Sequence, residues 1–387
     1  MENLLHTLSH TPPKQILRKL LFRLRGRVVL LKPEQPSRGN VLISYTTTPF
    51  TLLSKNELSG HSNYWEVRDM AHAFTERGYT VEVIDKYNDT FMPKRKYRYF
   101  LDVESNMGRL APHLGNQCTK IFFATGAYGE FQNEAEDSRI RALYQRRGTR
   151  VAPRRRVRDM NDIVSADIIS GICGSFPAST YEQFGKPIRM IHPSTTHLYP
   201  FNEKKDWDLA KKNILWFGGA GAVHKGLDLV LEAFAKMPEY TLFVCGKFEG
   251  EKDFVVAYHT ELYETPNIKS VGYVDPGGDT FKRIVDECGI VLSVSASEGC
   301  ATSIVLAMHA GLIPIVNKET GINVGDFGFM LSDSTIDDIR RTVHALAHEQ
   351  PAELERRARM TWEYAHNHHT RERFGKEFRA FLDTIHV

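Results

Sequence analysis

The stretch VLSVSASEGCATSIVLAMHAGLIPIV, residues Val291 to Val316, is the clearest indication of the fold of this chain. Its apolar runs and turn residues predict a strand over Ile290–Val294, a short polar loop, a helix over Thr302–His309 and a second strand over Leu312–Val316. A strand, a helix and a strand in such quick succession indicate an α/β unit with a parallel sheet.

The loop that follows the first of these strands is a candidate anion site. It contains Glu298 and Gly299, directly ahead of the helix. Ligands of open parallel sheets bind at the carboxyl ends of strands, because backbone N–H groups and the helix dipole converge there. Gly299 leaves room for a ligand, and Thr302 and Ser303 can add hydroxyl donors, so a diphosphate suits this place. The alternative is an ordinary strand-turn-helix in which Glu298 only caps the helix.

Length and composition indicate a globular protein of about two domains. The chain has 387 residues, of which 42% are hydrophobic and 25% are charged, and domains of about 150–200 residues are typical. A net charge of +3 is too small for a protein that coats nucleic acid, so we expect no nucleic-acid partner. The sequence has no run of about 18 apolar residues, and we therefore expect no transmembrane helix.

The cysteines and the N-terminus favour a cytoplasmic location. An odd number of scattered cysteines without a C-x-x-C pair favours free thiols over a zinc site or a disulfide framework. We also see neither the apolar core nor the cleavage site of a secretory signal. The five cysteines are Cys118, Cys173, Cys245, Cys288 and Cys300.

Residues 1–39 form a basic arm ahead of the first domain. Apolar residues recur at helical spacing from Ile16 to Leu24, and lysines and arginines fill most positions between them. Such a basic amphipathic helix over residues 14–27 can lie on an anionic membrane surface, which would make the protein peripheral at the inner face of the membrane. The alternative is a helix packed on the domain with its cationic side in water.

A first α/β series occupies residues 40–195. Strands over Val41–Thr47 and Thr80–Tyr87 flank a helix over Asn63–Arg77, which predicts a parallel βαβ unit. A helix near Asn133–Arg147 precedes the basic run Arg150–Arg158, which either binds phosphates or a membrane or is a solvated face. Further strands are expected at Tyr99–Val103, Lys120–Thr125, Asp167–Ile172 and Ile188–His192.

A second α/β series follows a polar linker at residues 196–212 and occupies residues 213–360. It begins with a strand over Asn213–Gly219 and a helix over Gly226–Ala235, and strands over Thr241–Gly246 and Ser270–Val274 come next. Residues 361–387 read as terminal helices with an aromatic packing side. The predicted architecture is two tandem doubly wound, Rossmann-like α/β domains.

The first strand of the second domain runs into the glycine-rich turn FGGAGAVHKG, Phe217 to Gly226. Such a turn lets backbone approach a phosphate closely, and Lys225 adds a positive charge at the start of the next helix. His224 stands where a G-x-G-x-x-G fingerprint needs its third glycine, and the sequence has no P-loop, which argues against NAD and ATP. The alternative for Lys225 is an exposed lysine at a helix start.

These residues resemble retaining glycosyltransferases of family 4, which have the GT-B fold. The resemblance is carried by the pattern G-G-x-G-x-x-x-K-G-x-x-x-x-L-x-A-F from Gly218 to Phe234, by Ser297–Gly299 and by Ala307–Val316. More loosely, Gly60–Asp85 is similar to the acceptor-side loop, first helix and second strand of that family, and Ser165–Ser175 to its strand before the linker.

The resemblance implies two domains that face each other across a cleft, with residues 361–387 crossing back to the N-terminal domain. It implies that Lys225 contacts the donor diphosphate and that Glu298 holds hydroxyls of the donor sugar, and these two are the candidate catalytic residues. The predicted donor-binding residues are Gly218, Gly219, Lys225, Gly246, Lys247, Val274, Glu298, Gly299, Thr302 and Ser303.

On the acceptor side, the resemblance implies that Gly60 permits close approach of a ligand. Polar candidates for contact are His61 and Asn63 at a helix start, and Tyr128, Glu130 and Asn133 after the strand Lys120–Thr125. For each of them, an exposed or capping role is the alternative.

Two positions depart from the family pattern. The family usually has an arginine where this chain has Gly219, and a ribose-binding glutamate where it has Leu306. Lys247 is a candidate replacement for the missing cation, whereas a leucine cannot replace a carboxylate. The identity of the donor is therefore left open.

The sequence predicts a metal-independent, retaining glycosyltransferase without a cofactor. We expect a nucleotide-diphosphate sugar as donor and a glycan or glycolipid as hydroxyl acceptor, in polysaccharide or glycolipid assembly. The pair Asp206 and Asp208 and the histidines His366, His368 and His369 resemble metal ligands only superficially, and we expect no metal site. Two alternatives stay open: a catalytically silent nucleotide-sugar-binding scaffold, and a sugar-nucleotide epimerase of the same fold.

Overall fold

A computed structural model describes residues 28–51, 61–104, 106–157 and 161–385. The chain divides into two compact units: unit 1 spans Met1–Phe123 and Asn161–Ile169, and unit 2 spans Ala124–Met160 and Ser170–Val387. The predicted membrane-binding segment, residues 14–27, lies outside the described residues.

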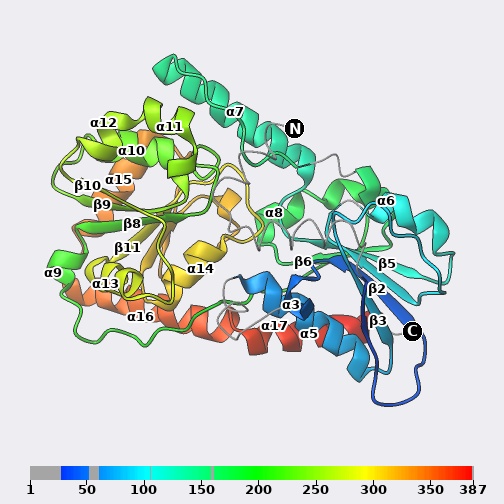
Figure 1. Cartoon of the computed structure of the whole chain (residues 1–387). Coiled ribbons are helices and arrows are strands. Elements are labelled where there is room, and N and C mark those ends of the chain that lie inside the picture. The colour runs from blue at the N-terminus through cyan, green and yellow to red at the C-terminus, as the bar shows by residue number, and fades with distance from the viewer. Residues whose placement is uncertain (1–27, 52–60, 105, 158–160, 386–387) are drawn as a thin grey trace. The chain divides into compact units, whose positions relative to one another are not determined.

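The first sheet has the strand order β1-β3-β2-β4-β5-β6-β7. Its strands β2, β3, β5 and β6 are labelled in Figure 1. Strands β2 and β3, β2 and β4, and β4 and β5 pair in parallel, as the βαβ pattern predicts, whereas β1 joins β3 antiparallel at the edge. The strands are β1 Val29–Leu31, β2 Asn40–Tyr45, β3 Thr80–Asp85, β4 Tyr99–Asp102, β5 Thr119–Ala124, β6 Ile168–Gly171 and β7 Ile188–Met190.

Helix α5, Ser62–Glu76, shows why the sequence of unit 1 folds locally as predicted. Its buried residues Val67, Met70, Ala71 and Phe74 recur at helical spacing and form one apolar face, so burial of that face stabilises the helix. The other helices of the first half are α3 Thr48–Thr51, α6 Met107–Leu110, α7 Gly129–Arg147 and α8 Ser175–Ser179, with short 3-10 turns at η1 Ala111–His113, η2 Asn161–Ser165 and η3 Glu182–Phe184.

The second sheet lies wholly in unit 2 and has the order β10-β9-β8-β11-β12-β13. All of its neighbouring strands pair in parallel. The strands are β8 Asn213–Gly218, β9 Thr241–Gly246, β10 Ile268–Gly272, β11 Ile290–Ser293, β12 Ile313–Val316 and β13 Phe329–Met330.

Helices cover both faces of this sheet, as Figure 1 shows. Alternate residues of β8 point to opposite faces: Ile214 and Trp216 join one hydrophobic cluster, and Leu215 joins the other. Helices α10 and α15 pack in the first cluster, and α13 and α14 in the second. The helices of unit 2 after β7 are α9 Trp207–Ala210, α10 Leu227–Phe234, α11 Lys252–Ala257, α12 His259–Tyr263, α13 Asp279–Glu287, α14 Thr302–His309, α15 Ile336–Ala347, α16 Pro351–His368 and α17 Arg371–Ile385, with 3-10 turns η4 Phe248–Gly250 and η5 Lys318–Thr320.

Helix α7 packs within unit 2. Its residue Leu143 belongs to the same hydrophobic cluster as α10, and Arg146 pairs with the fully buried Asp228 of α10 at 2.7 Å. Arg147 pairs with Glu261 of α12 and donates to the carbonyl of Ala257 at 2.7 Å. This division differs from the predicted one, in which residues 40–195 form one domain.

The predicted linker contains a short helix. Asp206 caps α9, because its Oδ1 accepts from the backbone N–H groups of Asp208 at 3.0 Å and Leu209 at 3.2 Å. The D-W-D sequence is thus a helix start. After the second sheet, Trp362 of α16 donates to the carbonyl of Tyr199, so the terminal helices hold this segment.

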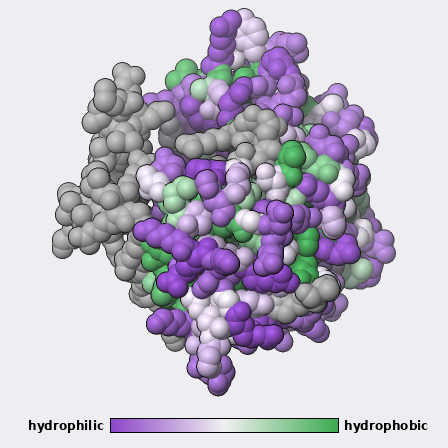
Figure 2. All heavy atoms as spheres, turned by 90° about the vertical axis from the view of Figure 1, so that its right-hand side faces the viewer, coloured by the Kyte–Doolittle hydropathy of each residue, from purple (hydrophilic) through white to green (hydrophobic). Residues whose placement is uncertain are grey.

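Hydrophilic side chains predominate on the face shown in Figure 2, and hydrophobic ones are scattered over it. The large exposed hydrophobic residues of unit 1 include Leu30, Tyr87 and Met92. Within the described part of the chain, no helix has the length and apolarity needed to span a membrane.

Candidate functional site

The glycine-rich turn after β8 is held by a buried carboxylate. Glu251 accepts from the N–H of Gly221 at 2.6 Å and from that of Ala222 at 3.1 Å. Gly221 has φ +94°, a conformation that favours glycine. These two amides therefore already have an acceptor, and any anion must be bound by other groups of the turn.

Lys225 and Glu298 form an ion pair at the carboxyl ends of β8 and β11. The Lys225 ammonium donates to Glu298 Oε1, and Ser295 Oγ approaches the same oxygen at 3.3 Å. Both side chains are 14% exposed. Burial alone would raise the pKa of Glu298, but the positive charges of Lys225 and Arg155 lower it, so the carboxylate stays ionised. The structure thus brings together the two predicted catalytic residues.

His224 connects the loops that carry this pair. Its Nε2 lies 2.6 Å from the carbonyl oxygen of Ser297 and therefore carries the hydrogen, and its own carbonyl accepts from Ala296 N–H at 2.6 Å. Burial lowers the pKa of His224, and the charges of Lys225 and Arg155 lower it further, which keeps the ring neutral. In the sequence analysis, His224 served only as an argument against a dinucleotide-binding fingerprint. Its hydrogen bonds between the two loops were not predicted.

The start of α14 has open backbone donors. Ala301 is the N-cap residue and provides no side-chain hydrogen bond to the helix. Within the described residues, the N–H groups of Thr302 and Ser303 donate to no protein acceptor, whereas that of Ile304 donates to the Ala301 carbonyl at 2.9 Å. Helix starts carry partial positive charge, so two free amides next to Glu298 suit an anionic ligand.

At several predicted donor-binding positions the surrounding structure has no room for any residue larger than glycine. A Cβ on Gly246 would clash with the carbonyl of Gly218, and a Cβ on Gly218 would lie 2.7 Å from the Trp216 ring. A Cβ on Gly299 would lie 2.8 Å from the carbonyl oxygen of Thr125. By contrast, Gly219 is exposed, and a Cβ there would meet only the Lys225 chain, at 3.9 Å.

A hollow of unit 2 lies beside two further predicted donor-binding residues, Val274 and Lys247. Its volume is about 400 Å³, and it extends from the end of β10 to the start of α13. Val274 lines it, and the Lys247 ammonium lies over the ring of Tyr273, another lining residue, at 4.8 Å from the centroid. The lining residues are Val271, Tyr273, Val274, Asp275, Gly278, Asp279 and Thr280.

Leu306 is a core residue. It is 5% exposed and packs in the hydrophobic cluster that also contains Val274 and Phe281. The position at which the family usually has a ribose-binding glutamate is therefore closed by apolar packing in this chain.

The acceptor-side candidates are in dissimilar environments. Gly60 lies outside the described residues. In unit 1, His61 is exposed at the N-cap of α5 and makes no side-chain cap bond, whereas the Oδ1 of Asn63 is buried and has no hydrogen-bond partner within the described chain.

The other three acceptor-side candidates belong to unit 2. Tyr128 is 3% exposed, and its ring packs edge-on against Phe184, so its burial argues against direct contact with an acceptor. Glu130 is exposed in the first turn of α7. The Asn133 amide donates to the Val157 carbonyl and accepts from the Val157 N–H, both at 3.0 Å, so it holds the basic segment in place.

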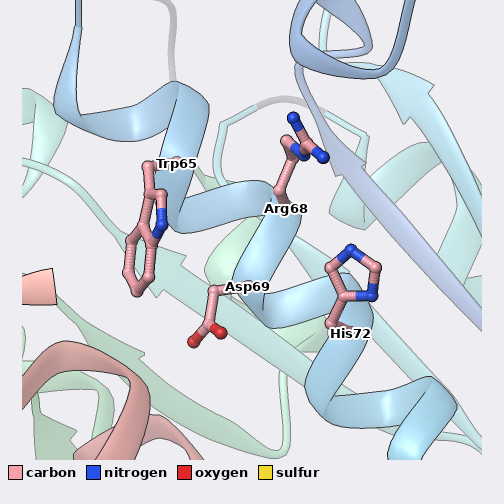
Figure 3. Close-up of a pocket in the computed structure, with 4 residues that line it drawn as sticks. All are labelled: Trp65, Arg68, Asp69 and His72. Carbon is pink, nitrogen blue, oxygen red and sulfur yellow. The ribbon is translucent and has the colours of Figure 1, made fainter. Parts of the chain in front are cut away.

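Unit 1 has a hollow that the sequence analysis did not predict (Figure 3). Four side chains of α5 line this cavity of about 270 Å³: Trp65, Arg68, Asp69 and His72. Their spacing of three or four residues places them along one exposed side of the helix. The apolar periodicity of α5 predicts its buried face only, so this polar side gave no signal of its own.

No metal centre is found in the described parts of the chain. No group of three or more His, Cys, Asp or Glu side chains is arranged there to hold a metal ion. Of the predicted histidine cluster, His369 is buried, and His366 packs on the Trp362 ring at 4.0 Å between centroids.

Comparison with known proteins identifies the domain that carries the ion pair. Residues 201–363 match the family model described as glycosyl transferases group 1. The chain therefore contains a glycosyl transferase group 1 domain. This group 1 domain includes Lys225 and Glu298, and the match confirms the family resemblance predicted from the glycine-rich turn and the Ser297–Gly299 loop. No curated protein matches the chain significantly in sequence.

Solved structures show the fold around the group 1 domain. HepE from Anabaena, in complex with UDP and glucose, is 13% identical with a TM-score of 0.57 over 90% of this chain and 100% of that one. Sucrose-phosphate synthase from Thermosynechococcus elongatus is 14% identical with a TM-score of 0.64 over 91% of this chain and 99% of that one. These likenesses confirm the predicted fold class, α/β with two parallel-sheet domains of the GT-B type.

Proposed function

We propose that the protein transfers a sugar from a nucleotide-diphosphate donor to a hydroxyl acceptor with retention of configuration. The observation that carries this proposal is the Lys225–Glu298 ion pair next to the open amides of Thr302 and Ser303. All four residues lie in the group 1 domain. HepE, which shares the fold, has been solved with UDP-glucose, and this supports a nucleotide sugar as the donor class.

The proposed reaction places the developing negative charge at this site. The bond between the anomeric carbon and the leaving phosphate oxygen breaks, and the acceptor oxygen bonds to the same face of that carbon. The acceptor proton passes to the leaving phosphate. Lys225 and the start of α14 stabilise the phosphate as its negative charge grows. Such electrostatic stabilisation of the transition state is usually the largest single contribution to catalysis. Glu298 then binds hydroxyls of the donor sugar and keeps Lys225 in position.

The hollow beside Val274 is the proposed site of the nucleotide base. Tyr273 offers an exposed aromatic ring at its edge, and ring stacking on a base is worth about 1–3 kcal/mol. Because Leu306 closes the usual carboxylate position, we propose that this chain does not bind the ribose through a glutamate on α14.

Leu306 also favours a second candidate function, a catalytically silent scaffold that binds nucleotide sugars. A missing carboxylate costs the protein a charged hydrogen bond to the ribose, which is typically worth about 1.5–3 kcal/mol. The scaffold would bind a nucleoside diphosphate at the same place without turning over any donor.

The test of the proposed function combines binding and turnover. Binding of UDP, GDP, ADP and CDP to the wild type would be measured by calorimetry, and release of nucleoside diphosphate from their glucose, galactose, mannose and N-acetylglucosamine conjugates would then be followed. We expect one nucleotide to bind and its sugar conjugates to be hydrolysed slowly, with both properties weakened by Lys225→Ala and turnover weakened by Glu298→Gln.

The outcomes separate the alternatives. Binding without turnover of any conjugate, in the presence or absence of simple sugars, supports the scaffold. Isomerisation of the donor without release of nucleotide supports an epimerase. No binding of any of the four nucleotides overturns the proposal. Because we propose metal-independent chemistry, turnover should also survive excess EDTA.

The cellular setting is a separate proposal that depends on residues outside the described structure. We propose that the protein acts in the cytoplasm on a glycan or glycolipid, with residues 14–27 on an anionic membrane surface. The basic and apolar composition of that segment supports this. Sedimentation with vesicles of phosphatidylglycerol, compared with phosphatidylcholine, tests it; equal sedimentation with both would contradict it.

A further inference from the structure

Three consecutive arginines, Arg154 to Arg156, follow α7, and within the described residues the outer two form ion pairs whereas the middle one does not. Arg154 pairs with Asp253 at 2.6 Å, and Arg156 pairs with Asp137. The guanidinium of Arg155 has no hydrogen-bond or ion-pair partner among the residues that the structure describes, and the residue is exposed. A run of arginines on a solvated face gives no reason for this difference.

The backbone at Arg155 is nevertheless held firmly. Glu136 of α7 is 2% exposed, and one of its oxygens accepts from the N–H groups of Arg154 at 2.8 Å and Arg155 at 2.9 Å. The Gln132 side chain donates to the Arg155 carbonyl, and Asn133 holds Val157 on both sides. The segment is thus fixed to α7, and the position from which the Arg155 side chain extends is well defined.

The side chain of Arg155 extends over the glycine-rich turn of the candidate site. A Cβ built on Gly221 would lie 2.6 Å from Arg155 Cγ and 3.1 Å from Cδ, so the aliphatic part of the arginine packs on this glycine. The turn leads directly into Lys225. The N–H of Lys225 donates to the carbonyl of Gly221 at 2.8 Å, so the arginine packs on the same glycine that holds the backbone of the lysine. The positive charge of Arg155 also lowers the pKa of Glu298.

We propose that Arg155 is a second cationic ligand of the donor diphosphate, contributed by the segment after α7. Within the described chain the guanidinium has no counter-charge, and an anion between it and the Lys225 ammonium would interact favourably with both. A guanidinium can also bind two phosphate oxygens at once, in addition to the point charge of a lysine. This inference rests on the proposed function, because it requires a nucleoside diphosphate at the site.

The proposal also explains how a glycine is tolerated at position 219. The sequence analysis considered Lys247 as the replacement for the missing cation, but the ammonium of Lys247 lies over the ring of Tyr273. Arg155, not Lys247, lies against the turn itself. We therefore assign the second cation of the phosphate site to Arg155.

The test uses Arg155→Gln, with Arg154→Gln and Arg156→Gln as matched controls from the same segment. The probes are inorganic pyrophosphate, the nucleoside diphosphate that binds the wild type most tightly, and its unphosphorylated nucleoside. We expect Arg155→Gln to weaken the diphosphate about tenfold, the effect of one charged hydrogen bond, and to leave the nucleoside unchanged. The two controls should stay within about twofold of the wild type, because their charges are already paired.

A rescue variant separates a phosphate ligand from a structural role. Gly219 is exposed and has room for a side chain, so Gly219→Arg in the Arg155→Gln background should restore most of the lost pyrophosphate affinity. Wild-type affinity in Arg155→Gln together with a loss in Lys225→Ala would overturn this proposal and leave the proposed function intact. Equal loss in all three arginine variants would overturn it as well, in favour of a diffuse charge effect. A wild type that binds neither pyrophosphate nor any nucleoside diphosphate overturns both.

Discussion

Each unit has a Lys–Glu ion pair at the carboxyl ends of its parallel strands, and the two pairs differ in what lies beside them. In unit 1, Lys86 follows β3 and pairs with Glu104, two residues after β4, at 2.5 Å. In unit 2, Lys225 pairs with Glu298. An ion pair at a strand end is therefore not enough to indicate a binding site in this protein.

The helix starts next to the two pairs account for the difference. In unit 1, the N–H groups of Asn106 and Met107 at the start of α6 donate to Asp102 Oδ2 at 2.9 and 2.7 Å. A buried carboxylate of the protein thus already occupies that helix start. In unit 2, the amides of Thr302 and Ser303 have no acceptor within the described chain. Unit 1 thus satisfies the amides of this helix start with its own carboxylate, whereas in unit 2 the corresponding amides have no acceptor among the described residues.

The largest expected effect comes from exchanging each lysine for alanine. Lys225→Ala should lower kcat/KM about 10²–10³-fold, because a donor aimed at the developing charge is lost. Lys86→Ala should change kcat/KM less than about threefold, since its pair has no open helix start beside it and partly exposed pairs contribute little. Steady-state release of nucleoside diphosphate measures both. Equal losses of kcat/KM in the two variants would contradict the proposed difference between the two ion pairs.

The second prediction concerns the stability that Asp102 provides to unit 1. Asp102→Ala leaves two buried amides of α6 without an acceptor and should lower the free energy of unfolding by about 1–3 kcal/mol. Urea unfolding followed by circular dichroism measures this change. Thr302→Ala at the open helix start serves as the control, with an expected change within about 0.5 kcal/mol. A larger loss for Thr302→Ala than for Asp102→Ala would show that the open site is the structural one.

How well the sequence predicts a structural feature depends on how far apart in the chain the residues that determine it are. The bounds of α14 and β9 agree with the predicted ones, because apolar periodicity and glycine stops are local signals. For β10 we predicted Ser270–Val274, but the strand is Ile268–Gly272: it ends where Gly272 turns to φ +77°, and Ile268 pairs with Leu242. The turn chemistry and the pairing partner outweigh the apolar run that extends to Val274.

Within the candidate site, the sequence named the Lys225–Glu298 pair but not its supports. Glu251, which holds the glycine-rich turn, and Glu136, which holds the basic segment, are far from their partners in the chain. The sequence around such a carboxylate does not indicate which distant backbone N–H group will donate to it in the folded chain. Arg155 was one member of a charge run, and only the pairing of its two neighbours distinguishes it.

Buried titratable groups of the two units should also contribute to stability with opposite pH dependence: Asp102 in unit 1, and His369 and His309 in unit 2. Burial raises the pKa of Asp102 in unit 1 to about 6, so this group contributes less stability as the pH rises from about 4 to 6. In unit 2, burial lowers the pKa of His369 to about 3 and that of His309 to about 4. The unfolded chain then binds protons first, and unit 2 loses stability as the pH falls below about 6.5.

Melting temperatures of two variants across pH 4–7 measure these opposite responses. The Tm of Asp102→Asn relative to the wild type should rise as the pH rises, because the variant has no carboxyl to ionise. The Tm of His369→Gln relative to the wild type should rise as the pH falls, because it has no imidazole to protonate. Each difference should reach several degrees, since about 1 kcal/mol shifts the Tm of a domain this size by about 2–4 °C. Parallel pH profiles of the two variants would contradict the assignment.

The smallest expected effect is the loss of pyrophosphate affinity when the N–H donor of Thr302 at the start of α14 is removed. Thr302 is the first residue of the helix, where proline fits without disturbing helical bonds, and the preceding Ala301 has the extended conformation that proline requires. Thr302→Pro therefore removes one N–H donor and the hydroxyl, whereas Thr302→Ala removes only the hydroxyl. We expect the proline variant to bind pyrophosphate about fivefold more weakly and the alanine variant within about twofold of the wild type, because a single amide donor contributes about 1 kcal/mol. If both variants bound as the wild type does, with unchanged melting temperatures, the phosphate would lie elsewhere. The open helix start would then have no part in the difference between the two units.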